Sequence, residues 1–253
     1  MQNTVQYLLR GETMLYFDFV QPYLMYLITV GVTIFLIRSI FLKTKFINKH
    51  KKTILIIITI LLAWTQFARY AGIFFDNGAE WSIWIFNFKI HAFNLRSHLP
   101  FYMCRISVVV LLYYVITKDK RVESFLFYWG ALGLAGVLYP NGEFTNSVNL
   151  TETFYIDHIL LTVTPFFLIV YQKYVPTFKD VIIISSLMFV ILVSFIFFNQ
   201  LLDTDYFYLE DQSIFAVLFG QQPKVLFAFV HSIVAMGFFS AYYIMFRNKE
   251  FEG

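Results

Sequence analysis

Long apolar stretches alternate with short polar segments along almost the whole chain, and each stretch is apolar on every face of a helix rather than along one stripe. A helix that crosses a bilayer needs about 20 mostly apolar residues. Seven stretches meet that requirement, at about 20–41, 53–75, 99–117, 123–140, 153–174, 180–201 and 223–246. Because no stretch shows the two-residue alternation of a β-barrel, the pattern predicts an all-α protein with seven transmembrane helices.

Residues 81–95, with the sequence WSIWIFNFKIHAFNL, are apolar and aromatic but too short to cross a bilayer. We expect this segment to lie at the outer membrane interface, where Trp and Phe settle between water and hydrocarbon, or to form a loop packed over the bundle. No repeat or linker divides the chain, and we expect no signal peptide, because the region before Val20 lacks a basic segment that leads into a short apolar stretch. Residues 1–253 are therefore expected to form a single membrane domain.

Composition supports this interpretation and narrows the function. Of 253 residues, 59% are hydrophobic and 14% are charged, whereas soluble domains have about 45–50% and about 25%. An ordinary soluble enzyme is therefore excluded. The single cysteine excludes a disulfide within the chain and a zinc site made of several thiolates. A net charge of +3 is too small to indicate a nucleic-acid partner, so the expected partners are membrane lipids.

The positions of the basic residues predict the orientation. Thirteen of the 19 Lys and Arg residues lie at the end of the first span, in the loop 43–52, in the loops after the third and fifth spans and in the C-terminal tail. Most acidic residues near the membrane lie in the loops of the other side. Lys and Arg gather in cytoplasmic loops. We therefore expect a multi-pass protein of the cell membrane whose N-terminus is outside and whose C-terminus is cytoplasmic.

Four spans carry polar residues at a similar depth. Ionisable groups inside spans are costly, and each is a functional-site hypothesis. At 1.5 Å per residue, Arg69, Cys104, His158 and His231 all lie roughly 8–13 Å below the outer boundary. Scattered structural residues would not need to share a layer, so this coincidence indicates one site.

Cys104 and His158 are the candidate catalytic pair. A lone cysteine in a helix is usually a small apolar residue. Here, however, Pro100 lies one turn earlier and frees backbone groups, and Arg105 and Arg69 would stabilise a thiolate. His158 shares its helix face with a threonine and a proline, at four- and seven-residue spacing.

The other polar residues of the spans are candidate substrate-binding groups. Arg69 shares a helix face with Gln66 and would reach a headgroup phosphate, although snorkelling to the headgroups is the simpler explanation. Arg105 is a second candidate for that role, and His231 is expected mainly to pack or to support the site. No resident metal and no cofactor are expected.

Three glycines in the fourth span, Gly130, Gly133 and Gly136, predict close helix packing. The turn at Tyr139-Pro140-Asn141-Gly142 ends that span. We expect the fourth span to lie at the centre of the bundle.

Four segments together resemble the YwaF-like family of bacterial integral membrane proteins. They are HLPFYMC (98–104), FYWG (127–130) with Pro140, DHILLTVTP (157–165) and NQLLDTDYFYL (199–209). A eukaryotic branch of that family is described as a cysteine-dependent transmembrane acyltransferase that moves fatty acyl chains between phospholipids. The resemblance implies that Cys104 is the nucleophile and His158 its partner.

The chain departs from the family pattern at several positions. Tyr102, which we group with the substrate-binding candidates, stands where the pattern has a histidine, and Asp205 stands where it has an asparagine. Of a Trp-Pro-Trp-Tyr run before the last span, only Pro223 is present.

The sequence thus predicts a membrane acyltransferase that uses a cysteine thioester. The alternatives are a transporter or channel, a non-catalytic membrane scaffold, and a metal-dependent hydrolase built on His98, His158 and His231. The last lacks any closely spaced histidine pair.

The orientation predicts a labelling pattern in intact cells. In a Cys104→Ala background, Lys49→Cys and Lys120→Cys should be shielded from an impermeant thiol reagent, whereas Glu143→Cys and Glu210→Cys should be labelled. The reverse pattern would overturn both the orientation and the shared depth of the polar residues.

Overall fold

The computed structural model describes residues 15–42, 44–70, 80–83, 86–89, 101, 103–138, 148–209, 220 and 222–247. Its α-helices are α2 (Leu15–Leu42), α3 (Thr44–Tyr70), α5 (Met103–Thr117), α6 (Glu123–Leu138), α7 (Val148–Gln172), α8 (Phe178–Leu202) and α10 (Lys224–Phe246). Two strands, β1 (Glu80–Ile83) and β2 (Phe86–Lys89), and two 3-10 turns, η2 (Lys120–Val122) and η3 (Tyr206–Tyr208), complete the described elements.

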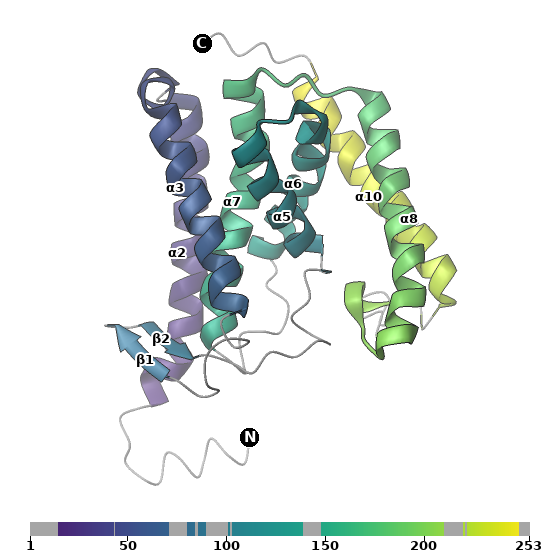
Figure 1. The fold of residues 1–253 in the computed structure, drawn as a ribbon, viewed down its shortest axis with the longest axis horizontal. Coiled ribbons are helices and arrows are strands. Elements are labelled where there is room, and N and C mark those ends of the chain that lie inside the picture. The colour runs from purple at the N-terminus through teal and green to yellow at the C-terminus, as the bar shows by residue number, and fades with distance from the viewer. Residues whose placement is uncertain are drawn as a thin grey trace.

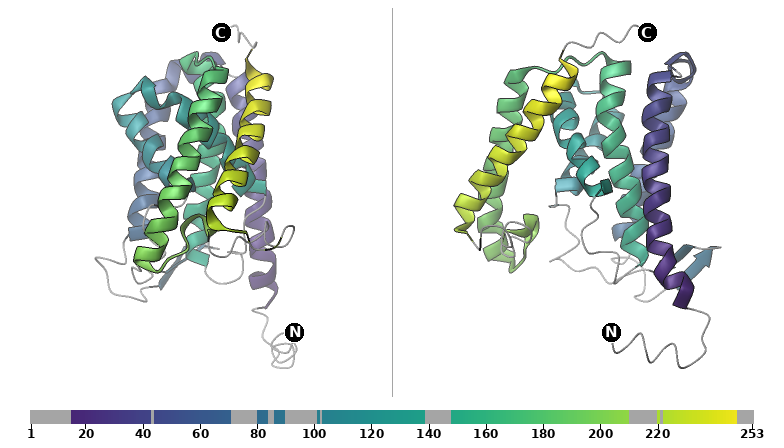
Figure 2. Two further views of the ribbon diagram at one scale, coloured as in Figure 1. Left: turned by 90° about the vertical axis from the view of Figure 1, so that its right-hand side faces the viewer. Right: turned by 180° about the vertical axis from the view of Figure 1, so that it is seen from behind.

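The helices run alternately up and down, so that α2 begins at one end of the bundle and α10 ends at the other (Figure 1). α2 and α3 lie on one side, α8 and α10 lie on the opposite side, and α5, α6 and α7 lie between them (Figures 1 and 2). The helix bounds follow the predicted spans within a few residues at most ends. The main exception is α3, which begins at Thr44 rather than near residue 53. Most of the lysine-rich segment that was expected to be a loop is therefore helical, because lysine is a good helix former.

Three helical segments of the described residues are long and apolar enough to cross a membrane: Tyr155–Gln172, Phe178–Leu202 and Lys224–Phe246. Three further segments are apolar but shorter: Tyr26–Leu42, Lys52–Phe67 and Met103–Thr117. The outward faces of these helices carry large apolar side chains such as Ile34, Ile60 and Leu201. Such faces are stable against hydrocarbon rather than water.

α6 is the centre of the bundle, as its glycines predict. Four successive side chains, Leu126–Trp129, are at most 1% exposed, so the helix is covered on all sides. Its glycine face lies against α7. A Cβ added at Gly133 would lie 2.9 Å from the Cβ of Leu161 and 3.1 Å from the backbone nitrogen of Thr162. Only a helix face without side chains allows the two backbones to approach this closely.

Pro165 lies inside α7, which continues through it to Gln172. Because proline has no N–H, the carbonyl of Leu161 loses its usual helical donor. That carbonyl points at α6, where a Cβ added at Gly130 would lie 2.9 Å from its oxygen. The glycine backbone thus approaches the very group that the proline leaves without a helical bond.

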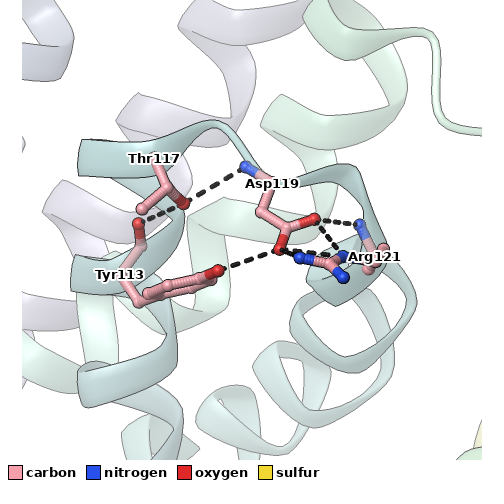
Figure 3. Close-up of polar contacts among 4 residues, drawn as sticks. All are labelled: Tyr113, Thr117, Asp119 and Arg121. Atoms are coloured by element: carbon pink, nitrogen blue, oxygen red, sulfur yellow. Dashed lines mark hydrogen bonds and ion pairs between the residues drawn. The ribbon is translucent and has the colours of Figure 1, made fainter.

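A compact polar turn joins α5 to α6 (Figure 3). The Asp119 carboxylate accepts hydrogen bonds from the Nη2 atom of Arg121 (2.7 Å), from the Arg121 backbone N–H (3.0 Å) and from the Tyr113 hydroxyl (2.9 Å). The Thr117 hydroxyl accepts from the Asp119 N–H and donates to the Tyr113 carbonyl. The hydrogen bonds of Arg121, and then that of Tyr113, hold the pKa of the Asp119 carboxyl well below its usual range.

The same end of the bundle is rich in exposed cations. The turns after α2, α5 and α7 and the end of α10 meet there (Figure 1). Nine exposed basic residues belong to it: Lys45, Lys49, Lys52, Lys118, Lys120, Arg121, Lys173, Lys179 and Arg247. The described acids at this end are engaged in local hydrogen bonds: the Tyr114 hydroxyl donates to Glu123 (3.0 Å), and Asp180 accepts from the N–H and the hydroxyl of Thr177, the N-cap of α8. The cations therefore dominate this surface.

The segment expected at the interface contains a short hairpin that the sequence analysis did not predict. β1 and β2 pair antiparallel, with Trp81 opposite Phe88 and Ser82 opposite Asn87. The fold is otherwise all-α in the described part of the chain. The hairpin lies near the start of α7 (Figure 1). Hydrophobicity alone did not indicate a strand here, because its aromatic and β-branched residues also suit an interfacial or loop segment.

The α6–α7 contact predicts which glycines tolerate a methyl group. Gly130→Ala should lower the stability of the purified protein by about 1–3 kcal/mol, because it overpacks a backbone contact. Gly237→Ala on α10 is the matched control, since nothing lies within 4 Å of its added Cβ, and better helix propensity should leave it unchanged or up to about 1 kcal/mol more stable. Thermal unfolding in detergent measures both. Equal effects at the two positions would contradict the close contact.

Candidate functional site

His158 lies in the seam between α7 and α6 and is buried, with 6% of its surface exposed. Its ring lies on the backbone of Gly136: an added Cβ there would overlap the Cδ2 atom and come within 2.5 Å of Nε2. The imidazole is therefore held by shape against a helix face that has no side chain. The spacing of the glycines predicts only helix packing for Gly136, whereas in the structure it also contacts the candidate base.

The face of α7 that carries His158 continues along the same seam. Thr162, one turn later, is buried beside Gly133, and its hydroxyl makes no hydrogen bond within the described residues. Pro165, another turn later, packs against Gly130. Asp157, next to His158 in sequence, is also buried, with 2% exposed. This part of α7 therefore brings several polar groups into the bundle interior.

Cys104 lies in the first turn of α5, which begins at Met103. This corrects the expectation that it lies about six residues into a helix starting near residue 99. Phe101 is not helical, and Pro100 precedes it. A proline favours the first turn and excludes an interior position, so the apolar run extends further than the helix. Cys104 is half-buried and packs against the main hydrophobic core.

The start of α5 lies partway along the bundle, whereas α7 extends beyond it toward the hairpin (Figures 1 and 2). The first N–H groups of a helix have no acceptor within it and carry partial positive charge. An interior helix start is therefore a position where a thiolate or an oxyanion is stabilised by backbone dipoles. This chemistry depends on where the helix begins, which the sequence analysis placed too early.

Arg105 lies in the same turn and is buried, with 9% exposed. A guanidinium keeps its charge in any surroundings, so a buried one in a membrane bundle is retained with polar or anionic groups around it. Arg69 lies in the last turn of α3, but its side chain is outside the described part of the structure, as is Tyr102. Gln66 on α3 is half-buried and its amide donates to the Thr65 hydroxyl (3.3 Å).

The helices that carry these groups contact one another directly. α5 packs against both α6 and α7, and α3 packs against both α5 and α7. Cys104, His158 and Gln66 thus come from three helices that pack against one another.

His231 belongs to a different helix pair. α10 packs chiefly along α8, and the His231 ring lies 5.5 Å from the ring of Phe227, one turn earlier on α10. It is half-buried there. Among the described residues, no group of three or more His, Cys, Asp or Glu side chains is placed to hold a metal ion. His98 lies outside the described residues.

Asn199, near the end of α8, is a buried polar residue to which the sequence analysis gave no role. Only 1% of it is exposed. Its amide oxygen accepts from the Tyr206 N–H (2.9 Å) and the Thr204 hydroxyl (3.0 Å), and its amide nitrogen donates to the Tyr206 carbonyl (2.9 Å). The sequence feature that could have indicated this role is a lone asparagine in an apolar span, followed closely by a polar turn.

Apolar helices in an up-and-down bundle, with polar side chains buried between adjacent helices, define a multi-pass helical membrane protein. The chain belongs to the TMEM164 family, which it matches over residues 16–243. The match includes Cys104, His158 and Asn199. No curated protein and no solved structure matches the chain.

The contact between His158 and Gly136 predicts a coupled effect on stability. Gly136→Ala should destabilise the protein, because the new methyl group overlaps the imidazole. In a His158→Ala background the same change should cost less, with a coupling energy of about 0.5–3 kcal/mol. Gly237→Ala should be additive with His158→Ala. Thermal unfolding of the three single variants, the two double variants and the wild type measures both cycles, and additivity at Gly136 would mean that the ring lies elsewhere.

Proposed function

We propose that this membrane protein transfers fatty acyl chains between phospholipids through a thioester on Cys104. The observation that carries the proposal is the position of its single cysteine, in the first turn of a helix that starts inside the bundle, beside a buried arginine and on a helix in contact with the one that carries His158. The resemblance to cysteine-dependent transmembrane acyltransferases of the YwaF-like family supports the same reaction. Family membership by itself indicates a membrane protein and leaves the mechanism open.

The first half-reaction moves the acyl chain to the protein. His158 takes the proton of the Cys104 thiol, and the sulfur attacks the carbonyl carbon of an ester in the donor phospholipid. The tetrahedral intermediate then breaks its carbon–oxygen bond. The departing lysophospholipid oxygen takes the proton from His158, and a thioester remains on Cys104.

The second half-reaction releases the acyl chain. A hydroxyl of an acceptor lysophospholipid gives its proton to His158 and attacks the thioester carbonyl. The carbon–sulfur bond breaks, and the sulfur recovers the proton from His158. One ester is lost and one is formed, so the exchange needs neither oxidant nor cofactor. Poor access of water to a site within the bundle favours transfer over hydrolysis.

The remaining residues would bind two negative charges: the oxyanion that develops during the reaction and the phosphate of the lipid headgroup. The backbone N–H groups of the first turn of α5, together with Arg105, are suited to stabilise the oxyanion of each tetrahedral intermediate. Arg69, Gln66 and Tyr102 are the proposed headgroup-binding residues, since arginine binds phosphate with two parallel hydrogen bonds. His231, on the α8–α10 pair, is proposed only to support the site from outside.

We also propose that the whole chain is one membrane domain of seven spans, with the N-terminus outside and the C-terminus in the cytoplasm. The gathering of nine exposed cations at one end of the bundle supports this orientation. It would place the start of α5 and His158 toward the outer leaflet, at the depth of glycerol esters.

Aromatic packing in the bundle argues against the alternative of a transporter or channel. Phe127 and Tyr128 at its centre contact Tyr242, Phe246 and Phe239 of α10, with ring centroids 5.0–6.2 Å apart. This layer of rings lies between the polar residues and the cation-rich end. A permeation path needs polar or water-filled continuity, which such a layer interrupts.

Detection of a thioester on Cys104 is the decisive test of the proposed function. After incubation of the purified protein with an acyl-labelled phospholipid and a lysophospholipid, the peptide that contains Cys104 should carry a hydroxylamine-labile adduct of fatty-acid mass. Cys104→Ser and Cys104→Ala should lose transfer, because a serine hydroxyl does not ionise near neutral pH as a thiol does. His158→Ala should slow adduct formation by about 10²–10⁴-fold.

His231→Ala is the matched control, since it removes a histidine from α10, which packs chiefly along α8, and it should cost far less activity. Full transfer by Cys104→Ala would rule out the thiol mechanism. Absence of transfer with every lipid pair, with Cys104→Ala lowering only thermal stability, would instead favour a non-catalytic scaffold.

A further inference from the structure

The turn that follows α8 is built around the side chain of Asn199. Its three side-chain hydrogen bonds, two to the backbone of Tyr206 and one to the Thr204 hydroxyl, are joined by a bond from the Thr204 N–H to the Asn199 carbonyl (3.0 Å). One buried amide thus satisfies both backbone groups of Tyr206. Only a side chain with a donor and an acceptor on one carbon can do this at that position.

The turn contains two backbone conformations that are unfavourable for their residues. Asp203 has φ 51° and Phe207 has φ 64°, both in the left-handed region that few residues other than glycine adopt. Such conformations persist only where surrounding contacts determine them. Here those contacts are the Asn199 hydrogen bonds and the Phe195 ring, whose centroid lies 4.8 Å from that of Phe207.

An aromatic contact connects this turn to the segment before α5. The Tyr206 ring is fully buried and meets Phe101 edge to face, at 5.5 Å between centroids and 84° between planes. Phe101 also contacts Phe195 (5.3 Å) and Phe198 (6.3 Å) of α8. Phe101 precedes the start of α5 by two residues and Cys104 by three.

From this chain of contacts we infer that Asn199 is a positioning residue for Cys104. Its amide holds Tyr206, Tyr206 and α8 hold Phe101, and Phe101 sets where the first turn of α5 lies and how closely Cys104 packs. The catalytic part of this inference rests on the proposed function, because the residue that Asn199 positions is the proposed nucleophile. The physical effect on the cysteine is independent of any acyl transfer.

The single cysteine of the chain makes this effect directly measurable. N-ethylmaleimide, applied to the full-length protein in nanodiscs far below its unfolding temperature, reports on Cys104 alone by a mass shift. Asn199→Ala should release the turn and speed alkylation of the half-buried thiol by about tenfold, as local opening becomes easier. It should slow thioester formation by about 10²-fold, the cost of misplacing a reacting group by about 1 Å.

Two further variants separate positioning from folding. Tyr206→Leu keeps every side-chain hydrogen bond of Asn199, because these bonds go to the backbone of residue 206 and to Thr204. It removes only the ring that meets Phe101. It should reproduce the faster alkylation, and combining it with Asn199→Ala should add little. Asn199→Asp, when protonated at acidic pH, keeps the accepting oxygen and an O–H donor for the Tyr206 carbonyl. It should match the wild-type alkylation rate measured at the same pH, since the thiolate fraction of Cys104 falls with pH in both proteins.

Two controls come from the same helix. Ser185→Ala removes a buried hydroxyl that makes no hydrogen bond in the described structure, and Leu192→Ala opens a cavity at a fully buried position. Both should leave the alkylation rate unchanged, although Leu192→Ala lowers stability.

The inference is overturned if Asn199→Ala and Tyr206→Leu are alkylated at the wild-type rate, or if Leu192→Ala accelerates alkylation equally. These outcomes are distinct from failure of the proposed function. If Cys104→Ala still transfers acyl chains, the thiol mechanism falls, while the alkylation rates continue to report whether Asn199 positions this cysteine.

Discussion

The close contact of α6 with α7 is the interaction on which the rest of the bundle depends. In lipid, no hydrophobic force drives one apolar helix toward another, so association relies on close packing and polar contacts. Gly130, Gly133 and Gly136 provide a face without side chains, and α7 places the Leu161 carbonyl, Pro165 and His158 against it. The same contact therefore brings the helices together and holds the imidazole. α5 and α3 then pack onto this pair.

The late start of α5 places a region of positive electrostatic potential inside the bundle. A helix that crossed the whole membrane would place its unpaired N–H groups at the surface, where water satisfies them. Because α5 begins at Met103, its first turn lies within the bundle, with Cys104 and the buried Arg105 in it. A fixed positive potential in surroundings of low dielectric acts more strongly on a thiolate or an oxyanion than it would in water.

The turns at the two ends of the bundle are stabilised in different ways. At the cation-rich end, the turns are closed by local hydrogen bonds, such as those of Asp119 and Asp180, and aromatic rings fill the space between α6 and α10. Away from that end, the arrangement relies on Asn199, whose amide stabilises a turn with two left-handed residues. Strained turns near a candidate site are expected where geometry matters more than stability.

The presence and approximate position of the apolar helices, the clustering of the cations and the central position of α6 could be predicted from the sequence. The span length, the charge of each loop and the spacing of small residues are local properties, and the bilayer acts on them directly. The rarity of such residues in apolar spans also indicated Cys104 and His158 as a candidate pair, and their catalytic role stays a prediction. The family assignment to TMEM164 covers the same region.

Only the tertiary structure decided which faces meet. Helices that are apolar all round carry no stripe that shows which side turns inward, so nothing local places the His158 ring on Gly136 or His231 on the α8–α10 pair. The start of α5 was predicted too early because the apolar run begins before Phe101, which is not helical, whereas the helix begins at Met103. The link from Asn199 through Tyr206 to Phe101 joins residues about a hundred positions apart, and such a contact exists only once the chain has folded.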